Sequence, residues 1–338
     1  MTRKLLLGFA VLLVIAGAAY FRLHHAPAPL EIAYAANRQV TLQSTTAQVR
    51  EPITTVSYGD RLEVLQRFQD QVNVRTAGGL TGWVSERDLL STDIWQKAAD
   101  LGKRTSSLPV QARGRTRALT NLRVDAGRDG VRLRQLNKNI PLQIFERRAV
   151  DVPTNGAAPA SDEQASEPAA RKEDWWLIRA QTSDKDSVSG WILGHFIDLD
   201  VPQPLPDYAS SAGMRIVSWS ELNKVADATG KERPQYLLLG AHGPEGQPCD
   251  FSTLRVYTWG KKRQRYETAY VESGVCGKLP VEVKDSPQAG ETKFSFMDLS
   301  TGAPAQRGYV MRQTIVRRVK QAGETKPRKA RAPRTHTH

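Results

Sequence analysis

Short runs of alternating apolar and polar residues dominate the chain from Val40 onward. They form one group within residues 62–84 and a second group within residues 142–192. Alternation over a few residues, bounded by Gly and other turn formers, predicts short β-strands with one buried face. The stretch 92–103 differs, because its apolar residues recur at helical spacing and it lacks Pro. The pattern therefore predicts a mainly β protein with a short helix between two β regions.

The two groups repeat each other. Leu62-Glu-Val-Leu65 matches Leu142-Gln-Ile-Phe145 at an offset of 80 residues. Val74-Arg75 matches Ile178-Arg179 at an offset of 104, and Gly82-Trp-Val84 matches Gly190-Trp-Ile192 at an offset of 108. Most of the extra length in the second copy falls in residues 154–172, which are rich in Ala, Pro, Ser and Glu. This segment has no apolar periodicity, so it is predicted to be a disordered loop at the tip of a hairpin.

The order of the strand motifs resembles that of bacterial SH3-like (SH3b) domains. The second copy is the better match. Its four matching segments are the opening strand Thr120–Val124, Asn139–Phe145, Trp175–Arg179 and the closing Gly190-Trp-Ile192. The resemblance covers about 40–201 and implies two small β-barrels in tandem.

The first copy departs from the family pattern in two places. It keeps Gly59-Asp60 and Gly82-Trp83-Val84. Its opening strand, however, reads Leu42-Gln-Ser-Thr, and Gln71-Val72 stands where the family usually has an aromatic residue. We therefore expect a divergent barrel over 37–91, a helical linker over 92–116 and a more typical barrel over 117–201.

Residues 202–320 are also predicted to be rich in strands, and they resemble no well-characterised family. The stretch Trp219–Ala226 is interpreted as a short helix. Six segments have strand character: Tyr236–Leu239, Leu254–Trp259, Arg265–Val271, Leu279–Val283, Lys293–Met297 and Tyr309–Val316. We expect a β-rich carboxy-terminal domain over 202–320.

A hairpin in this domain bears on the two cysteines. Gly260-Lys-Lys-Arg263 is predicted to be a tight turn that pairs Trp259 with Gln264 and Tyr257 with Tyr266. In that register Cys249 lies diagonally opposite Cys276, close enough for a disulfide. Two free buried thiols are the alternative. A disulfide agrees with an oxidising compartment outside the cytoplasm.

The amino terminus predicts export. Residues 5–21 form an uncharged apolar run that follows Arg3 and Lys4 and is closed by Arg22. Segment 1–24 is therefore interpreted as a signal anchor that spans the membrane or as a cleaved signal peptide. Both alternatives place the rest of the chain outside the cytoplasm, either anchored to the inner membrane by a single pass or secreted to the periplasm.

The charge is concentrated at the ends of the chain. The formal net charge is +13, but segment 1–24 holds three basic residues and no acidic one, and 312–338 holds nine basic residues against Glu324 alone. The body between them is close to neutral, so we expect no nucleic-acid partner. Segment 321–338 is predicted to be a disordered basic tail. It either binds an anionic surface or is simply solvated.

The sequence contains no recognisable catalytic motif. The only His residues after Cys249 and Cys276 are His336 and His338, in the tail, so a cysteine peptidase lacks a base. The body His residues, His195 and His242, have no partner at the spacing of a zinc site. We expect no enzyme activity, no metal and no cofactor.

Four residues of the second copy are candidates for ligand binding. Trp175 and Trp176 are adjacent, so in a strand they face opposite sides, and one is expected to be exposed or covered by the neighbouring domain. Asn121 and Arg123 lie in the opening strand, where structural hydrogen bonding is the alternative role. The hypothesis is a non-catalytic envelope protein that binds peptidoglycan or a wall peptide through its SH3-like domains. The alternative is a protein–protein scaffold or assembly factor in the envelope.

Overall fold

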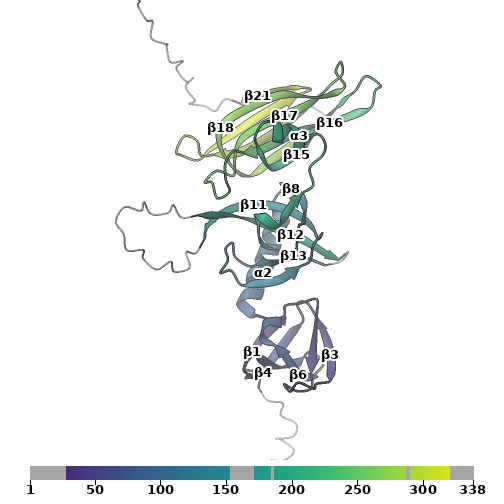
Figure 1. Ribbon diagram of the computed structural model, residues 1–338, viewed down its shortest axis with the longest axis vertical. Coiled ribbons are helices and arrows are strands. Elements are labelled where there is room, and N and C mark those ends of the chain that lie inside the picture. The colour runs from purple at the N-terminus through teal and green to yellow at the C-terminus, as the bar shows by residue number, and fades with distance from the viewer. Residues whose placement is uncertain (1–27, 153–170, 184–185, 287–289, 320–338) are drawn as a thin grey trace, which may run out of the picture. The chain divides into compact units, whose positions relative to one another are not determined.

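The computed structural model describes residues 28–152, 171–183, 186–286 and 290–319 (Figure 1). The chain is mainly β and divides after Lys97 into two compact units. The predicted export segment 1–24, the predicted loop residues 154–170 and the tail 321–338 lie outside the described residues. Within the described ranges, none of the helices combines the length and the apolar character needed to cross a membrane.

The first unit contains a seven-stranded antiparallel sheet. Its elements are β1 (Glu31–Ala35), β2 (Gln39–Gln43), β3 (Pro52–Ser57), β4 (Arg61–Phe68), β5 (Gln71–Thr76), β6 (Thr81–Ser85), the 3-10 turn Glu86–Asp88 and β7 (Leu89–Ser91). The strand order is β3-β2-β6-β5-β4-β1-β7. Alternating side chains point inward and form one core, because β-strands turn successive residues to opposite faces. We call this sheet the first module.

Helix α2 (Thr92–Ser107) follows β7 directly. Near its start, Trp95 stacks on Tyr34 of β1 with ring centroids 4.8 Å apart. Near its end, Thr105 is buried and shares a 2.8 Å hydrogen bond with Ser189. Arg104 forms a bidentate pair with Glu146. The helix was predicted from its apolar spacing, and both of its ends have specific contacts.

A second seven-stranded sheet, the second module, repeats the first. Its elements are β8 (Ala112–Thr116), β9 (Thr120–Arg123), β10 (Arg132–Leu136), β11 (Pro141–Asp151), β12 (Lys172–Ser183), β13 (Asp186–Leu193), the 3-10 turn Gly194–Phe196 and β14 (Ile197–Leu199). The strand order is β10-β9-β13-β12-β11-β8-β14. This is the order of the first module, strand for strand.

The strand registers of the two modules also correspond. Val64 pairs with Val74 just before a bulge in β4, and Ile144 pairs with Ile178 just before a bulge in β11. These pairs are the residues that the sequence repeat matches. The repeated sequence therefore encodes a repeated sheet, down to the position of an irregularity.

Two predicted boundaries were wrong. Strand β1 begins at Glu31, before the predicted start of the first barrel at 37, and it pairs with both β4 and β7. Strand β8 occupies 112–116, which was predicted to be linker, and it pairs with β11 and β14. Both strands are short and have few large apolar residues, so their alternation is weak in the sequence. Only their neighbours in the sheet reveal their role.

The hairpin β11–β12 is longer than its counterpart β4–β5. In the first module the hairpin ends at the pair Phe68–Gln71. In the second module the equivalent pair Arg148–Trp175 is followed by three further pairs, the last of which joins Asp151 to Lys172. The strand therefore already includes Lys172, which was predicted to belong to the loop. Part of the inserted sequence extends the hairpin stem.

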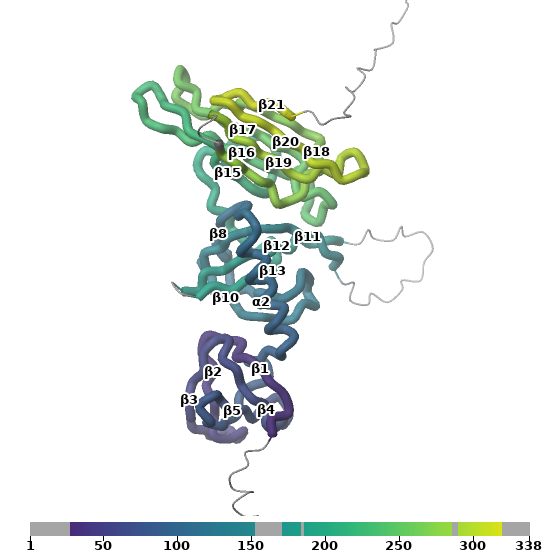
Figure 2. Tube along the Cα trace, turned by 180° about the vertical axis from the view of Figure 1, so that it is seen from behind, coloured from purple at the N-terminus to yellow at the C-terminus, as the bar shows by residue number. Residues whose placement is uncertain are grey.

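The third module is a meander that can be followed strand by strand in Figures 1 and 2. Its elements are α3 (Leu205–Ser211), β15 (Arg215–Ala226), β16 (Glu232–Ala241), β17 (Phe251–Gly260), β18 (Arg265–Ser286), β19 (Glu291–Asp298), β20 (Ala305–Arg312) and β21 (Ile315–Val319). The seven strands are hydrogen-bonded in sequence order. Helix α3 packs Leu205 and Ala209 against Tyr236, Leu238 and Tyr257.

Two predictions for the third module were wrong. Residues Trp219–Ala226 belong to β15 and are not a helix. Two register shifts in β15, one between Glu221 and Lys224, interrupt the alternation and give apolar spacings that imitate a helix. The β17–β18 hairpin pairs Trp259 with Tyr266, so Tyr257 lies opposite Thr268 and not Tyr266. The loop is 261–264, one residue later than predicted.

Candidate ligand-binding cleft

Neither of the two adjacent Trp residues is exposed. Strand β12 turns Trp175 into a cluster with Leu177 and Trp191, where the end of α2 contributes Leu101. Trp176 points the other way, is 8% exposed, and lines a cavity together with Arg215 and Glu245 of the third module. A stacking role for an openly exposed ring therefore has no basis in the geometry, and Trp175 is a core residue.

Asn121 and Arg123 of β9 do not meet the two Trp residues in a shared site. Arg123 donates a 2.5 Å hydrogen bond to the carbonyl of Gly130, and burial lowers the pKa of its guanidinium. Asn121 is opposite Gln135 in the sheet. Neither residue lines the cavities described below. Arg123 holds the turn between β9 and β10, which is a structural task.

The two cysteines are joined. Cys249 and Cys276 form a disulfide with an S–S distance of 2.06 Å and Cα atoms 4.8 Å apart. The bond ties the loop 242–250 to strand β18. The next residue, Asp250, is buried, and its carboxylate accepts a 2.8 Å hydrogen bond from the backbone N–H of Leu279. The disulfide thus fixes a loop that carries a buried charge.

That charge belongs to an ion cluster where the second and third modules touch. Arg147 of β11 has a side chain that is 1% exposed. Its guanidinium donates to Asp174 of β12 and, over 2.9 Å, to Asp250. It also donates to the backbone carbonyls of Gln247, at 2.9 Å, and Cys249, at 3.2 Å. Burial by itself lowers the pKa of Arg147, but the two carboxylates outweigh burial and raise it.

Two further basic residues complete the cluster. Lys278 lies 2.9 Å from the Asp250 carboxylate, and Arg215 lies 3.5 Å from Asp174. The backbone N–H of Gly246 donates a 2.8 Å bond to Asp174. A buried charge is tolerated when it is paired with an opposite charge. The cluster therefore holds loop 242–250 against β11 and β12.

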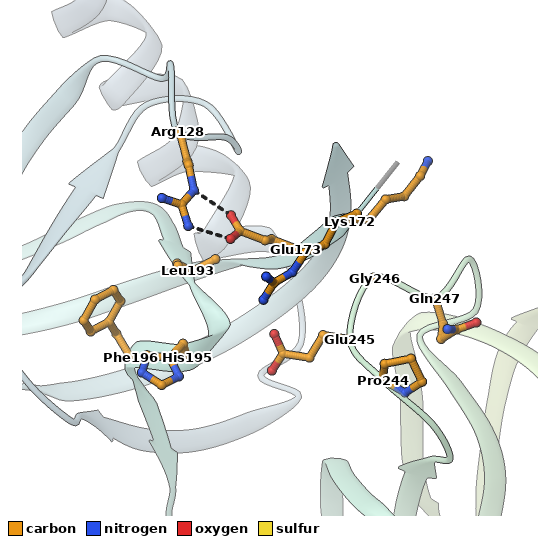
Figure 3. Close-up of a pocket in the computed structure, with 11 residues that line it drawn as sticks. Arg128, Lys172, Glu173, Leu193, His195, Phe196, Pro244, Glu245, Gly246 and Gln247 are labelled. Atoms are coloured by element: carbon orange, nitrogen blue, oxygen red, sulfur yellow. Dashed lines mark hydrogen bonds and ion pairs between the residues drawn. The ribbon is translucent and has the colours of Figure 1, made fainter. Parts of the chain in front are cut away.

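A cleft opens beside this cluster and is shown in Figure 3. It measures about 910 Å³. One wall comes from the second module and includes Leu193, His195 and Phe196; the other comes from loop 242–250 and includes Pro244 and Glu245. The remaining lining residues are Arg128, Arg171, Lys172, Glu173, Gly246 and Gln247. The cleft is thus open and lined by charges of both signs.

The charges of the cleft are partly fixed in place. Arg128 and Glu173 form a bidentate pair at 2.6 and 3.0 Å. The hydrogen bonds from Arg128 lower the pKa of the Glu173 carboxyl below its usual value. On the opposite wall, Glu245 points its carboxylate into the space (Figure 3). A ligand in this cleft meets fixed carboxylates and guanidinium groups that suit a peptide with both amino and carboxyl groups.

A smaller cavity of about 260 Å³ shares His195 and Glu245 with the cleft. Trp176 forms part of its lining. The other lining residues are Arg117, Ile144, Gly194, Ile197, Leu199, Arg215 and Ile216. Of the four residues singled out from the sequence, Trp176 is therefore the one at the candidate site.

Across the described ranges, no group of three His, Cys, Asp or Glu residues is positioned to hold a metal ion. The ring of His195 packs edge-on against Phe196, and His242 contacts the carbonyl of Gly213 at 3.0 Å. The cleft can form ion pairs and hydrogen bonds with a ligand.

Sequence reasoning missed the cluster altogether. Arg147, Asp174 and Asp250 lie in unremarkable charged stretches, and nothing in their local spacing distinguishes them from solvated residues. One signal was available. Asp174 directly precedes the Trp pair, but Asp250, the other carboxylate that Arg147 binds, is distant in sequence.

Comparison with known proteins gives little guidance. A scan against protein-family models finds no matching family, and no curated protein matches the chain. Among solved structures, the chain is similar to NlpC2 from Trichomonas vaginalis, with 10% sequence identity, a TM-score of 0.17, and coverage of 86% of this chain and 98% of that one. A similarity this low carries no argument about function.

Proposed function

We propose that this chain is a non-catalytic binding protein of the bacterial envelope, located outside the cytoplasm, that binds peptidoglycan through its wall peptides. In this proposal the first and second modules are SH3-like domains, as their strand motifs suggest. The cleft of about 910 Å³ beside the second module is the binding site. The observation that carries the proposal is this cleft, whose walls present carboxylates and guanidinium groups together.

Wall peptides have the complementary chemistry. Their carboxyl groups pair with Arg128, Arg171 or Lys172, and their free amino group pairs with Glu245. Charge-assisted hydrogen bonds of this kind are about twice as strong as neutral ones. Because the buried cluster around Arg147 holds the wall formed by loop 242–250, a ligand need not order that wall first, and preorganisation favours affinity.

The test is sedimentation of the full chain with isolated peptidoglycan sacculi at 0.5 M salt. At that ionic strength the basic tail contributes little, because exposed charges are screened within a few ångströms. The matched control adds an excess of a free wall-type peptide to the intact sacculi. We expect the chain to sediment with the sacculi and the free peptide to keep it in solution. Equal sedimentation with and without the peptide, or none at all, would reject peptide binding.

A protein–protein scaffold is the second candidate function, and one surface favours it. The outer face of β19 to β21 exposes Met297, Ile315 and Val319, which are 42%, 59% and 47% exposed. Strand β21 is also an edge strand, and edge strands offer unpaired backbone groups to a partner. Cross-linking in living cells distinguishes the two functions. A scaffold yields defined protein adducts from this face even when the sacculus experiment is negative.

A further inference from the structure

The ion cluster at the contact between the second and third modules is not electrically balanced. It contains three basic side chains, Arg147, Arg215 and Lys278, and two carboxylates, Asp174 and Asp250. Arg147 bonds to both carboxylates, and Lys278 bonds to Asp250 at 2.9 Å. The cluster therefore keeps one positive charge in excess.

Arg215 carries that excess. Its only ion pair among the described residues is the 3.5 Å contact with Asp174, which is too long for a good hydrogen bond. Its Nε is buried and has no hydrogen-bond partner. A buried donor without a partner costs about 1–3 kcal/mol. The guanidinium of Arg215, whose side chain is 33% exposed, is thus incompletely hydrogen-bonded within the fold.

The unsatisfied group lies at a cavity of suitable size. Arg215 lines the small cavity of about 260 Å³. The wall also contains the ring of Trp176 and the side chains of Ile144, Ile197 and Ile216. Arg117 lies at the same cavity, but Asp198 already pairs with it at 2.7 Å. The cavity therefore combines a guanidinium that has one long ion pair with several apolar side chains.

We infer that this cavity is a subsite for the terminal carboxylate of a peptide that ends in a small apolar residue. The inference rests on the proposed function, since it names the part of the wall peptide that enters the cavity. A carboxylate matches the planar guanidinium of Arg215. Asp174 and Glu245 lie nearby and disfavour a doubly charged anion such as phosphate. The apolar wall accommodates a methyl group.

Each of the two cavities then holds a different part of the peptide. The carboxyl end of the peptide occupies the small cavity against Arg215 and Trp176. Glu245 and His195 line both cavities, so the preceding residues pass them and continue into the larger cleft.

The test uses one synthetic wall-type peptide that ends in D-alanyl-D-alanine, prepared as the free acid and as the carboxamide. Binding to the full chain is measured by calorimetry. We expect the free acid to bind at least about tenfold more tightly, since a charged hydrogen-bonding pair replaces a neutral one. Arg215→Gln should abolish this preference. Arg113→Gln, on the exposed face of β8 outside both cavities, should preserve it.

The outcomes separate the two proposals. Equal binding of acid and amide by the unchanged chain overturns the subsite but leaves wall-peptide binding in place. Sedimentation with intact sacculi but no binding of either peptide also overturns the subsite. Failure to bind both the sacculi and the peptides rejects the proposed function itself. Because the acid–amide comparison uses the unchanged chain, it decides the inference even if Arg215→Gln folds poorly.

Discussion

Arg67 and Arg147 occupy equivalent positions in the two repeated sheets, two residues after the same bulge, yet their surroundings are opposite. Arg67 lies opposite Val72 and forms ion pairs with Glu31 and Glu86, with its side chain 46% exposed. Arg147 lies opposite Trp176, and its side chain is 1% exposed. One position of the repeat thus carries a solvated ion pair in one copy and the centre of a buried cluster in the other.

This contrast predicts a large difference in stability between two matched variants. Arg147→Ala leaves Asp174 and Asp250 buried without their main partner, and we expect a loss of about 3–5 kcal/mol in the free energy of unfolding. Arg67→Ala removes exposed pairs and should cost about 1 kcal/mol or less. Urea unfolding of both variants, followed by circular dichroism, makes the comparison. Equal losses would show that Arg147 does not hold the contact together.

The carboxylate of Asp298 predicts a sensitivity to acid. Burial by itself raises its pKa, but bonds from Ser300 and from the N–H of Cys276, with the charge of Arg307, outweigh burial and lower it. The ionised carboxylate therefore stabilises the fold fully above its ordinary value of 3.8. This contribution disappears as the pH falls from that value through the lower folded pKa.

The check compares unfolding free energies of the unchanged chain and Asp298→Asn at pH 7, 5 and 3. The variant should be less stable at pH 7 and should lose less stability between pH 5 and pH 3. Parallel losses in the two proteins would mean that another carboxyl group dominates the acid response.

The disulfide predicts a further effect on stability. Cys249 and Cys276 are separated by 27 residues in sequence. Closing a loop of that length restricts the unfolded chain and stabilises the fold by about 3 kcal/mol in the chain-entropy description. The double variant Cys249→Ser, Cys276→Ser should lose about that much in urea unfolding. The reducing agent that weakens the unchanged chain should leave the double variant unaffected. A response of the double variant to the agent would count against this explanation.

Replacing either of two glycines by alanine should change the free energy of unfolding, and the two changes should be in opposite directions. A Cβ on Gly277 would lie 2.1 Å from the ring of Phe251, which is fully buried, so Gly277→Ala should destabilise by about 1–3 kcal/mol. A Cβ on Gly102 of α2 meets nothing within 4 Å, so Gly102→Ala should stabilise by up to about 1 kcal/mol through helix propensity. Thermal unfolding distinguishes the two. A stabilising Gly277→Ala would contradict the packing of β17 against β18.

The β character and the internal repeat were accessible from the sequence because they depend on local alternation. Matching residues such as Val74 and Ile178 occur at the same register positions in the two sheets. Strand β15 was misread because its bulges break that alternation. The register of the β17–β18 hairpin was also missed, since turn residues alone do not fix where the loop 261–264 begins.

The candidate site was harder to predict because its chemistry arises between modules. Trp176 is recognisable in the sequence as an aromatic residue, but its position in a cavity beside residues of the third module depends on tertiary contacts. Nothing in the sequence pattern distinguishes Arg147 and Asp250, because an ion pair between distant residues produces no periodic pattern in the sequence. Local sequence patterns specify strands. The role of the buried Arg147, by contrast, depends on its ion pair with Asp250, which lies about a hundred positions away in the sequence.

The cluster around Arg147 has a consequence for how such chains are assembled from parts. Arg147 and Asp174 neutralise each other within the second module, and Asp250 and Lys278 do so within the third. Each module therefore supplies its own counterion for these two pairs. Neither module has to bury an unpaired charge of these pairs before the two modules come into contact. A foreign module exchanged into either position would have to bring a complete acid–base pair. A replacement module without such a pair would leave a buried charge without its counterion at this contact.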